Sequence, residues 1–213
     1  MRVTPTTIPL KQVLEARTFF VPPYQREYSW ELEQVSDLFY DIESSDENER
    51  HFLGSLLFFE KDKSKKEIEI IDGQQRLMTL SLLLYSIKKA IKDSGETDAI
   101  SMVDSLLYVR SESLLKNKRT DDPRFAASER DRRLFRAILR GEPVAAFKDG
   151  RYKSHKRILQ VLESFFDVKL EKLKTDKGIE GVIKYAENVI YSQFIEMVAE
   201  NKNDTVLLFR TLN

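Results

Sequence analysis

The densest cluster of polar side chains in the sequence is the run IDGQQR at residues 71–76. It lies between a segment with the pattern of a strand and a segment with the pattern of a long helix. A helix N-terminus has unpaired N–H groups and a partial positive charge, so this junction favours an anion. Gly73 lets a ligand approach the backbone closely, and Arg76 offers a planar fork that suits phosphate oxygens. The run therefore predicts a phosphate-binding turn.

The other polar residues of this run could take part in chemistry. Gln74 and Gln75 can hydrogen-bond a phosphate or a ribose, or position a water molecule. Asp72 can hold a metal ion or orient a nucleophile. A purely structural interpretation is also open, because Asp72 and Gln75 have the spacing of a helix capping box and Gly73 would then only ease a turn.

A second cluster, PPYQREYSW at residues 22–30, combines aromatic rings with an amide and a cation. A loop that carries Tyr24, Gln25 and Arg26 could stack a base and reach its edge or a phosphate. The competing interpretation is a rigid turn, and we expect Trp30 to lie in the core. Arg26 is the stronger functional candidate, because its near neighbour Glu27 points elsewhere on a turn.

A third feature is a basic stretch over residues 110–158, which holds fifteen basic and seven acidic residues. Such a stretch could contact a nucleic-acid backbone. The interspersed acids also fit an ordinary solvated surface, on which we expect His155 to lie. The candidate DNA-binding residues are Arg132, Arg133, Arg136, Lys153 and Lys156.

Hydropathy patterns predict the elements that would position these clusters. Residues 19–21 are predicted to form a short strand, and residues 51–59 and 67–71 a hairpin. A helix is expected from Trp30, capped by Ser29, and a long helix from Asp72 to about residue 93. Further helices are predicted at 98–117, 128–140, 154–175, 178–191 and 205–212, with a strand at 194–199.

Composition excludes several kinds of protein. The 213 residues carry 35 basic and 35 acidic side chains, and no cysteine. Disulfides, thiolate zinc sites and cysteine nucleophiles are therefore excluded within this sequence. Only two histidines are present, so a histidine-rich metal site is not expected. The sequence begins without a signal-peptide pattern and has no membrane-length apolar run, so we expect a cytoplasmic protein with no membrane partner. The predicted strands and helices together make the expected fold class α+β.

Three segments together resemble a known family. They are PPYQREYSWELEQVSDLFYDIE, HFLGSLLFFE and EIEIIDGQQRLMTLSLLL. Over residues 8–92 they resemble the N-terminal domain of GmrSD-type modification-dependent restriction proteins, and more distantly the N-terminal domain of ParB and sulfiredoxin. The resemblance implies a ParB/sulfiredoxin-like small sheet with helices in residues 1–95, followed by a mostly helical part in residues 96–213. The ending LFRTLN is similar to the start of a further family motif, so we expect a C-terminal HNH-type nuclease domain to be missing here.

The family resemblance also implies an activity. ParB relatives and sulfiredoxin bind nucleotides, and restriction members use nucleoside triphosphates to control DNA cleavage. The implied function is a Mg²⁺-dependent nucleoside triphosphatase that senses or regulates restriction of phage DNA. Its implied partners are a nucleotide and modified DNA, and a homodimer is compatible with it.

The resemblance assigns roles residue by residue. Asp72 and Gln75 would be catalytic, and Asp72 would also hold the metal. Sulfiredoxin chemistry is excluded, because the cysteine that it needs at the turn is a glutamine here. A P-loop is excluded as well, because no GKS or GKT run is present. The nucleotide-binding residues would be Gly73, Gln74, Arg76, Tyr24, Gln25, Arg26 and Asn213.

Two other functions remain compatible with the residues. One is a non-enzymatic DNA-binding module, in which the basic helices and the loop from Tyr24 to Trp30 would hold DNA and the DGQQR turn would hold a backbone phosphate. The other is a scaffold that acts without nucleotide.

Overall fold

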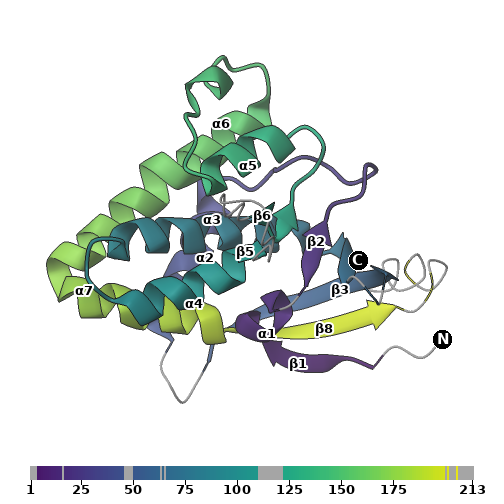
Figure 1. Ribbon diagram of the computed structural model, residues 1–213, viewed down its shortest axis with the longest axis horizontal. Helices are drawn as coiled ribbons and strands as arrows, with labels where there is room; N and C mark the ends of the chain where they lie inside the picture. Colours follow the sequence, from purple (N-terminus) through teal and green to yellow (C-terminus); the bar gives the residue numbers. More distant parts are fainter. Residues whose placement is uncertain are drawn as a thin grey trace, which may run out of the picture.

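A mixed sheet of six strands forms the centre of the described part of the computed structural model (Figure 1). The model describes residues 4–15, 17–45, 50–62, 64, 66–109, 122–199, 201 and 205. In spatial order the strands are β1 (Thr6–Pro9), β8 (Gln193–Ala199), β3 (Phe52–Asp62), β4 (Glu67–Asp72), β2 (Thr18–Phe20) and β7 (Phe125–Ala126). A separate pair joins β5 (Tyr108–Val109) to β6 (Asp122–Pro123). The predicted α+β class is confirmed.

The predicted hairpin is present, because β3 and β4 pair antiparallel. The apolar run of β4 is buried on both faces: Ile68 and Ile70 are at most 3% exposed on one face, and Ile71 is 6% exposed on the other. β2 runs parallel to β4 and confirms the short strand expected near residue 19. Phe19 of β2 packs against Phe58 of β3 with 5.4 Å between ring centroids. Aromatic and β-branched side chains thus hold the middle of the sheet.

Helices cover the sheet and extend beyond it (Figure 1). The long helix predicted after the hairpin is confirmed, and its stripe Leu77, Leu80, Leu84, Ile87 and Ile91 is at most 1% exposed. No helix within the described ranges is both long and apolar enough to cross a membrane. The helices are α1 (Leu10–Leu14), α2 (Leu32–Ser44), α3 (Gln74–Ile91), α4 (Thr97–Leu107), α5 (Arg132–Leu139), η1 (Ala145–Phe147), α6 (Lys153–Leu159), η2 (Gln160–Phe166) and α7 (Asp167–Tyr191).

Several element boundaries differ from the prediction. α2 begins two residues later than expected. Its N-terminus is capped by a capping box between Glu31 and Gln34 and not by Ser29. The backbone N–H of Ser29 is instead hydrogen-bonded to the side chain of Gln75. The helix expected over residues 98–117 ends at Leu107, where the chain turns into β5. The helix expected over residues 205–212 lies outside the described residues, apart from Thr205.

Strands from both sides of residue 95 build the sheet. β8, which confirms the strand expected near residues 194–199, lies between β1 and β3, and β7 lies beside β2. Phe194 of β8 is fully buried in the same core cluster as Leu56 of β3. The two sequence parts therefore share one hydrophobic core, and the helical part is attached to the sheet at two places.

Candidate functional site

A pocket of about 410 Å³ opens where β4 ends and α3 begins. Both polar clusters of the sequence contribute to it, since one wall is the turn at residues 71–76 and the other is the loop at residues 22–30. Its volume lies within the range of roughly 300–1,000 Å³ that is typical of small-molecule sites. The described residues that line it are Gln25, Arg26, Trp30, Asp72, Gly73, Gln74, Gln75 and Arg76.

Gly73 forms the turn between β4 and α3. Its φ of 95° places it in the left-handed region, and an ideal Cβ here would lie 2.3 Å from Cδ2 of Leu56. Both facts require glycine at this position. Gly73 is also the N-cap of α3, and among the described residues no side-chain cap hydrogen bond is present. The capping box proposed for Asp72 and Gln75 is not formed, because both ends of the Gln75 amide bond to the backbone of the loop. The first-turn N–H groups of α3 keep the partial positive charge of an uncapped helix end.

Two glutamines fasten the loop to the turn through the backbone. Nε2 of Gln25 donates to the carbonyl of Ile71 at 2.7 Å, and Nε2 of Gln74 donates to the carbonyl of Arg26 at 2.6 Å. Gln74 is only 4% exposed, so this hydrogen bond is shielded from water. The two bonds run in opposite directions between the same pair of segments and set the width of the pocket.

Gln75 makes a third connection to the loop. Its Oε1 accepts from the N–H of Ser29 at 2.8 Å, and its Nε2 donates to the carbonyl of Glu27 at 3.1 Å. Both ends of the amide are thus engaged with backbone. This geometry supports a positioning role for Gln75 in the loop, and the catalytic role expected of it stays a prediction.

Arg76 is held from beneath by β3. Its Nη1 donates to the carbonyl of Ser55 at 2.7 Å, and an ideal Cβ on Gly54 would lie 2.9 Å from the same nitrogen. Gly54 has a φ of 97° and lies at an irregularity in the pairing of β3 with β8. Burial lowers the pKa of Arg76, and the charge of Asp72 opposes that change. The guanidinium remains charged and keeps further donors for a ligand.

The charge of the pocket is positive, because two arginines face a single acid. Asp72 is half-buried and is the one carboxylate among the described lining residues. Arg26 is exposed, and within the described part of the chain its side chain has no hydrogen bond or ion pair. No group of three or more histidine, aspartate or glutamate side chains in the described ranges could hold a metal by itself. A cation here would need ligands from a bound anion.

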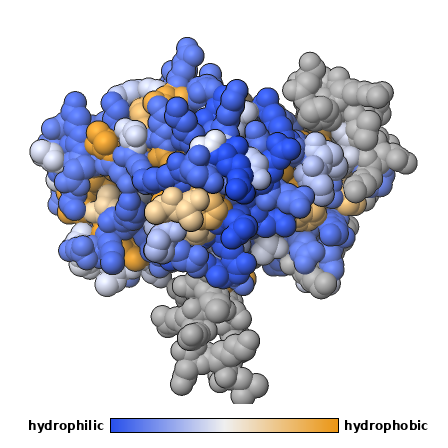
Figure 2. All heavy atoms as spheres, turned by 90° about the horizontal axis from the view of Figure 1, so that it is seen from above, coloured by the Kyte–Doolittle hydropathy of each residue, from blue (hydrophilic) through white to orange (hydrophobic). Residues whose placement is uncertain are grey.

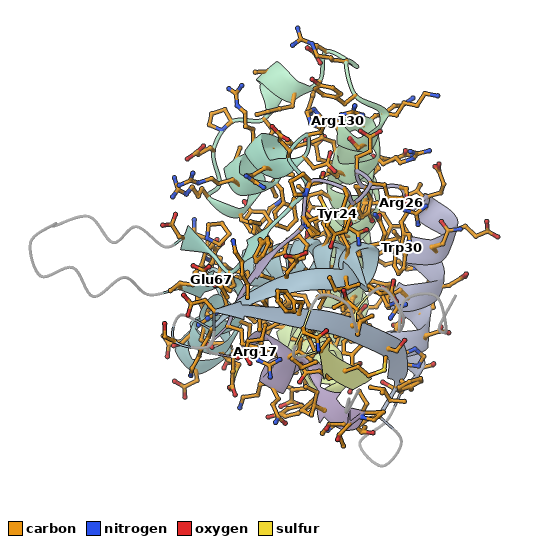
Figure 3. All side chains as sticks on the ribbon, turned by 90° about the vertical axis from the view of Figure 1, so that its right-hand side faces the viewer. Arg17, Tyr24, Arg26, Trp30, Glu67 and Arg130 are labelled. Carbon is orange, nitrogen blue, oxygen red and sulfur yellow. The ribbon has the colours of Figure 1, made fainter. Side chains whose placement is uncertain are left out.

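The aromatic residue of the pocket is Trp30, and Tyr24 lies outside it. Trp30 was expected in the core, but it is half-buried, packs against the core on one side and lines the pocket on the other. Tyr24 is 66% exposed, and its hydroxyl donates to Glu69 of β4 at 2.7 Å. Burial of that hydroxyl and its hydrogen bond to Glu69 raise the pKa of Tyr24. Figure 3 shows Tyr24, Arg26 and Trp30 on one side of the molecule.

Asn213 lies outside the described residues. Sequence reasoning missed the support that Gly54 and Ser55 give to Arg76. A glycine inside an otherwise apolar strand was the available signal, because such a glycine marks a bulge or a close approach.

The helical part fixes the loop from the other side. Asp131 is fully buried, and its Oδ2 accepts from the N–H of Tyr28 at 2.7 Å and from Oγ of Ser128 at 3.0 Å. Arg130 pairs with Glu27 at 3.2 Å. The pocket loop is therefore anchored to α3 through glutamines and to the start of α5 through a buried carboxylate.

The residues expected to bind DNA do not line one pocket. Arg132 and Arg136 line a small pocket beside Asp122, with which Arg136 pairs at 3.2 Å. Arg133 projects into a different pocket, and Lys153 and Lys156 are exposed on α6 but line neither. The helical period separates residues 132 and 136 from residue 133.

The face of the molecule drawn in Figure 2 is mostly hydrophilic, with small hydrophobic areas between the polar side chains. His155 was expected at such a surface, but it is only 5% exposed, and its Nε2 lies 3.0 Å from the carbonyl of Arg130. His155 is therefore packed inside the helical part and does not lie on its surface.

The comparison with known proteins agrees with the early resemblance. A family model described as the N-terminal domain of GmrSD restriction endonuclease matches residues 10–213. No curated protein matches the sequence. The match covers both the pocket and the helical part.

Proposed function

Since this chain belongs to the family of GmrSD restriction endonuclease N-terminal domains, and so to a restriction system, we propose that it binds and hydrolyses a nucleoside triphosphate. The site is the pocket between the loop at residues 22–30 and the N-terminus of α3. Hydrolysis there would regulate the restriction activity of the complete protein.

The observation that carries this proposal is the fixed position of Arg76 beside an uncapped helix N-terminus. The bond to Ser55 and the absence of a side chain on Gly54 preorganise the guanidinium. A phosphate chain needs such fixed donors, because a preformed site avoids the entropy of ordering a long cation. Arg26, which is exposed at the opposite wall, supplies a second charge.

The rest of the pocket suits the other parts of a nucleotide. Trp30 offers a ring against which a base can stack. Asp72 would hold Mg²⁺, which typically uses one or two carboxylates together with phosphate oxygens. When bound, Mg²⁺ neutralises negative charge on the transferred phosphoryl group. Asp72 would also orient a water molecule, while the glutamines hold the loop.

Calorimetric titration of ATP, GTP, CTP and UTP with Mg²⁺ into the chain and into Arg76→Ala tests the proposal. We expect one of the four to bind the unmodified chain and to release phosphate, and binding to be lost in the variant. Arg132→Ala is the matched control, because Arg132 is an arginine outside this pocket. Equal affinity in a folded Arg76→Ala protein, or binding of none of the four, would reject the assignment.

The alternative of a non-enzymatic DNA-binding module has less support from the geometry. The backbone of the loop from Tyr24 to Trp30 is engaged with glutamines and with Asp131, and the basic residues of α5 are divided between two pockets. This alternative predicts strongly salt-dependent DNA binding that persists in Arg76→Ala.

A further inference from the structure

A second pocket, of about 510 Å³, lies in the helical part and is separate from the triphosphate pocket. Three cations and three rings line most of it. They are Arg130, Arg133 and Arg151 together with Phe147, Tyr152 and His155. They come from the turn before α5, from α5 itself, from η1, from the two residues before α6 and from α6.

The rings form a rigid wall. His155 is buried, and its ring meets Phe147 at 5.6 Å and Tyr152 at 4.9 Å between centroids, each in an edge-on arrangement. The contact of Nε2 with the carbonyl of Arg130 fixes the imidazole. Phe147 and Tyr152 are half-buried, so each is supported on one side and leaves part of its ring to the pocket. A flat heterocycle can stack on the exposed part of Phe147 or Tyr152, and the buried ring of His155 supports both.

The cations are available to an anion. Arg133 is exposed, and in the described part of the chain its side chain has no hydrogen bond or ion pair. Arg130 pairs with Glu27 at 3.2 Å and Arg151 with Asp149 at 3.8 Å, but both arginine side chains are at least 67% exposed. Exposed ion pairs of this kind contribute little to stability, so either arginine can leave its carboxylate and bind a phosphate. Glu129 and Asp149 also line the pocket and leave it with a small positive balance.

We propose that this second pocket binds a nucleoside phosphate unit, with the base against the aromatic wall and the phosphate on Arg133. Stacking platforms next to arginines are the arrangement that proteins use for single nucleotides of a strand. The same chemistry is offered by a nucleotide within single-stranded DNA and by a free nucleotide. The site is independent of the triphosphate pocket, although Arg130 connects it to the loop at Glu27.

The experiment uses the two histidines of the chain as reporters. Imidazole NMR signals of the full chain are followed while a short oligothymidylate or thymidine 5′-monophosphate is added. A His51→Gln variant assigns the signal of His155. We expect the His155 signal to move and the His51 signal to stay, since His51 lies beside Asp41 and outside the pocket.

Affinities measured with labelled oligothymidylate then test the role of the cation. Arg133→Ala is expected to weaken binding by roughly fivefold or more. The plot of log affinity against log salt concentration should also become less steep, by about 0.7 in slope. Arg136→Ala, one turn further along α5 and outside this pocket, should leave both values unchanged. Arg76→Ala should also leave them unchanged, which separates this proposal from the triphosphate site.

The two probes distinguish the source of the ligand. If only the monophosphate shifts the NMR signal of His155, and the shift is lost in Arg133→Ala, the ligand is a free nucleotide. If only the oligothymidylate shifts this signal, and the shift is again lost in Arg133→Ala, the ligand is a nucleotide within single-stranded DNA. An unmoved His155 signal with both probes, or equal weakening by Arg133→Ala and Arg136→Ala, would overturn the proposal, because binding would then be absent or spread over the basic surface.

Discussion

An ideal Cβ on Gly54 would lie 2.9 Å from Nη1 of Arg76, so the absence of a side chain on Gly54 gives the guanidinium its place beneath the pocket. The nearby carbonyl of Ser55 accepts from the same nitrogen. A residue of β3 that does not line the pocket thus determines where its main cation lies.

Gly54→Ala is expected to displace the Arg76 guanidinium and to weaken nucleotide binding by about tenfold, which corresponds to the loss of one charge-assisted hydrogen bond. Calorimetric titration measures the affinity. Gly150→Ala is the matched control, because Gly150 also has a positive φ, of 72°, but has no atom within 4 Å of the added carbon. Equal nucleotide affinities in the two variants would contradict the positioning role of Gly54.

Gly73→Ala is expected to lower the free energy of unfolding by about 2–4 kcal/mol, because backbone strain and a clash add together. The added carbon would lie 2.3 Å from Cδ2 of Leu56, in the buried core. Urea denaturation measures the loss. Gly95→Ala has a similar φ, of 83°, with open space around it, so it should lose about 1 kcal/mol. A loss no larger at Gly73 than at Gly95 would show that Leu56 moves aside at little cost.

Asp72→Asn is expected to reduce phosphate release at least about tenfold while nucleotide affinity falls less, because a carboxylate that holds Mg²⁺ and orients water acts mainly in the reaction. The melting temperature should change little, since Asp72 caps no helix. Steady-state kinetics and thermal melting give the two readouts. A large drop in melting temperature with unchanged turnover per folded molecule would instead assign Asp72 a structural role.

Asp131→Ala is expected to destabilise the protein by about 1–3 kcal/mol, because it leaves the buried N–H of Tyr28 without an acceptor. The loop would loosen as well, so nucleotide affinity should fall although Asp131 lies outside the pocket. Asp131→Asn keeps an acceptor oxygen and should recover most of the affinity. Titration and urea denaturation of both variants measure the effects, and an unchanged affinity in a folded Asp131→Ala protein would contradict the anchoring role.

The elements and residue types of the site follow from local patterns in the sequence. The apolar alternation at residues 67–71 and the period of the helix from residue 77 to residue 91 were sufficient to predict a hairpin followed by a buried helix. A glycine and an arginine at that junction predicted an anion site, because helix N–H groups and the guanidinium are local features. These properties depend on neighbours within a few residues.

How the site is closed depends on contacts between residues that are far apart in the sequence. Gln25 meets Ile71 across 46 positions, and Tyr28 meets Asp131 across 103, and neither contact has a local signature. α2 begins at Leu32, where Glu31 and Gln34 form its capping box, while Gln75 accepts from the N–H of Ser29. Trp30 lines the pocket at the end of a loop that is held on both sides. Loops have no periodic pattern of their own, so the conformation of this loop is set by partners that are distant in the sequence, such as Gln75 of α3 and Asp131 before α5.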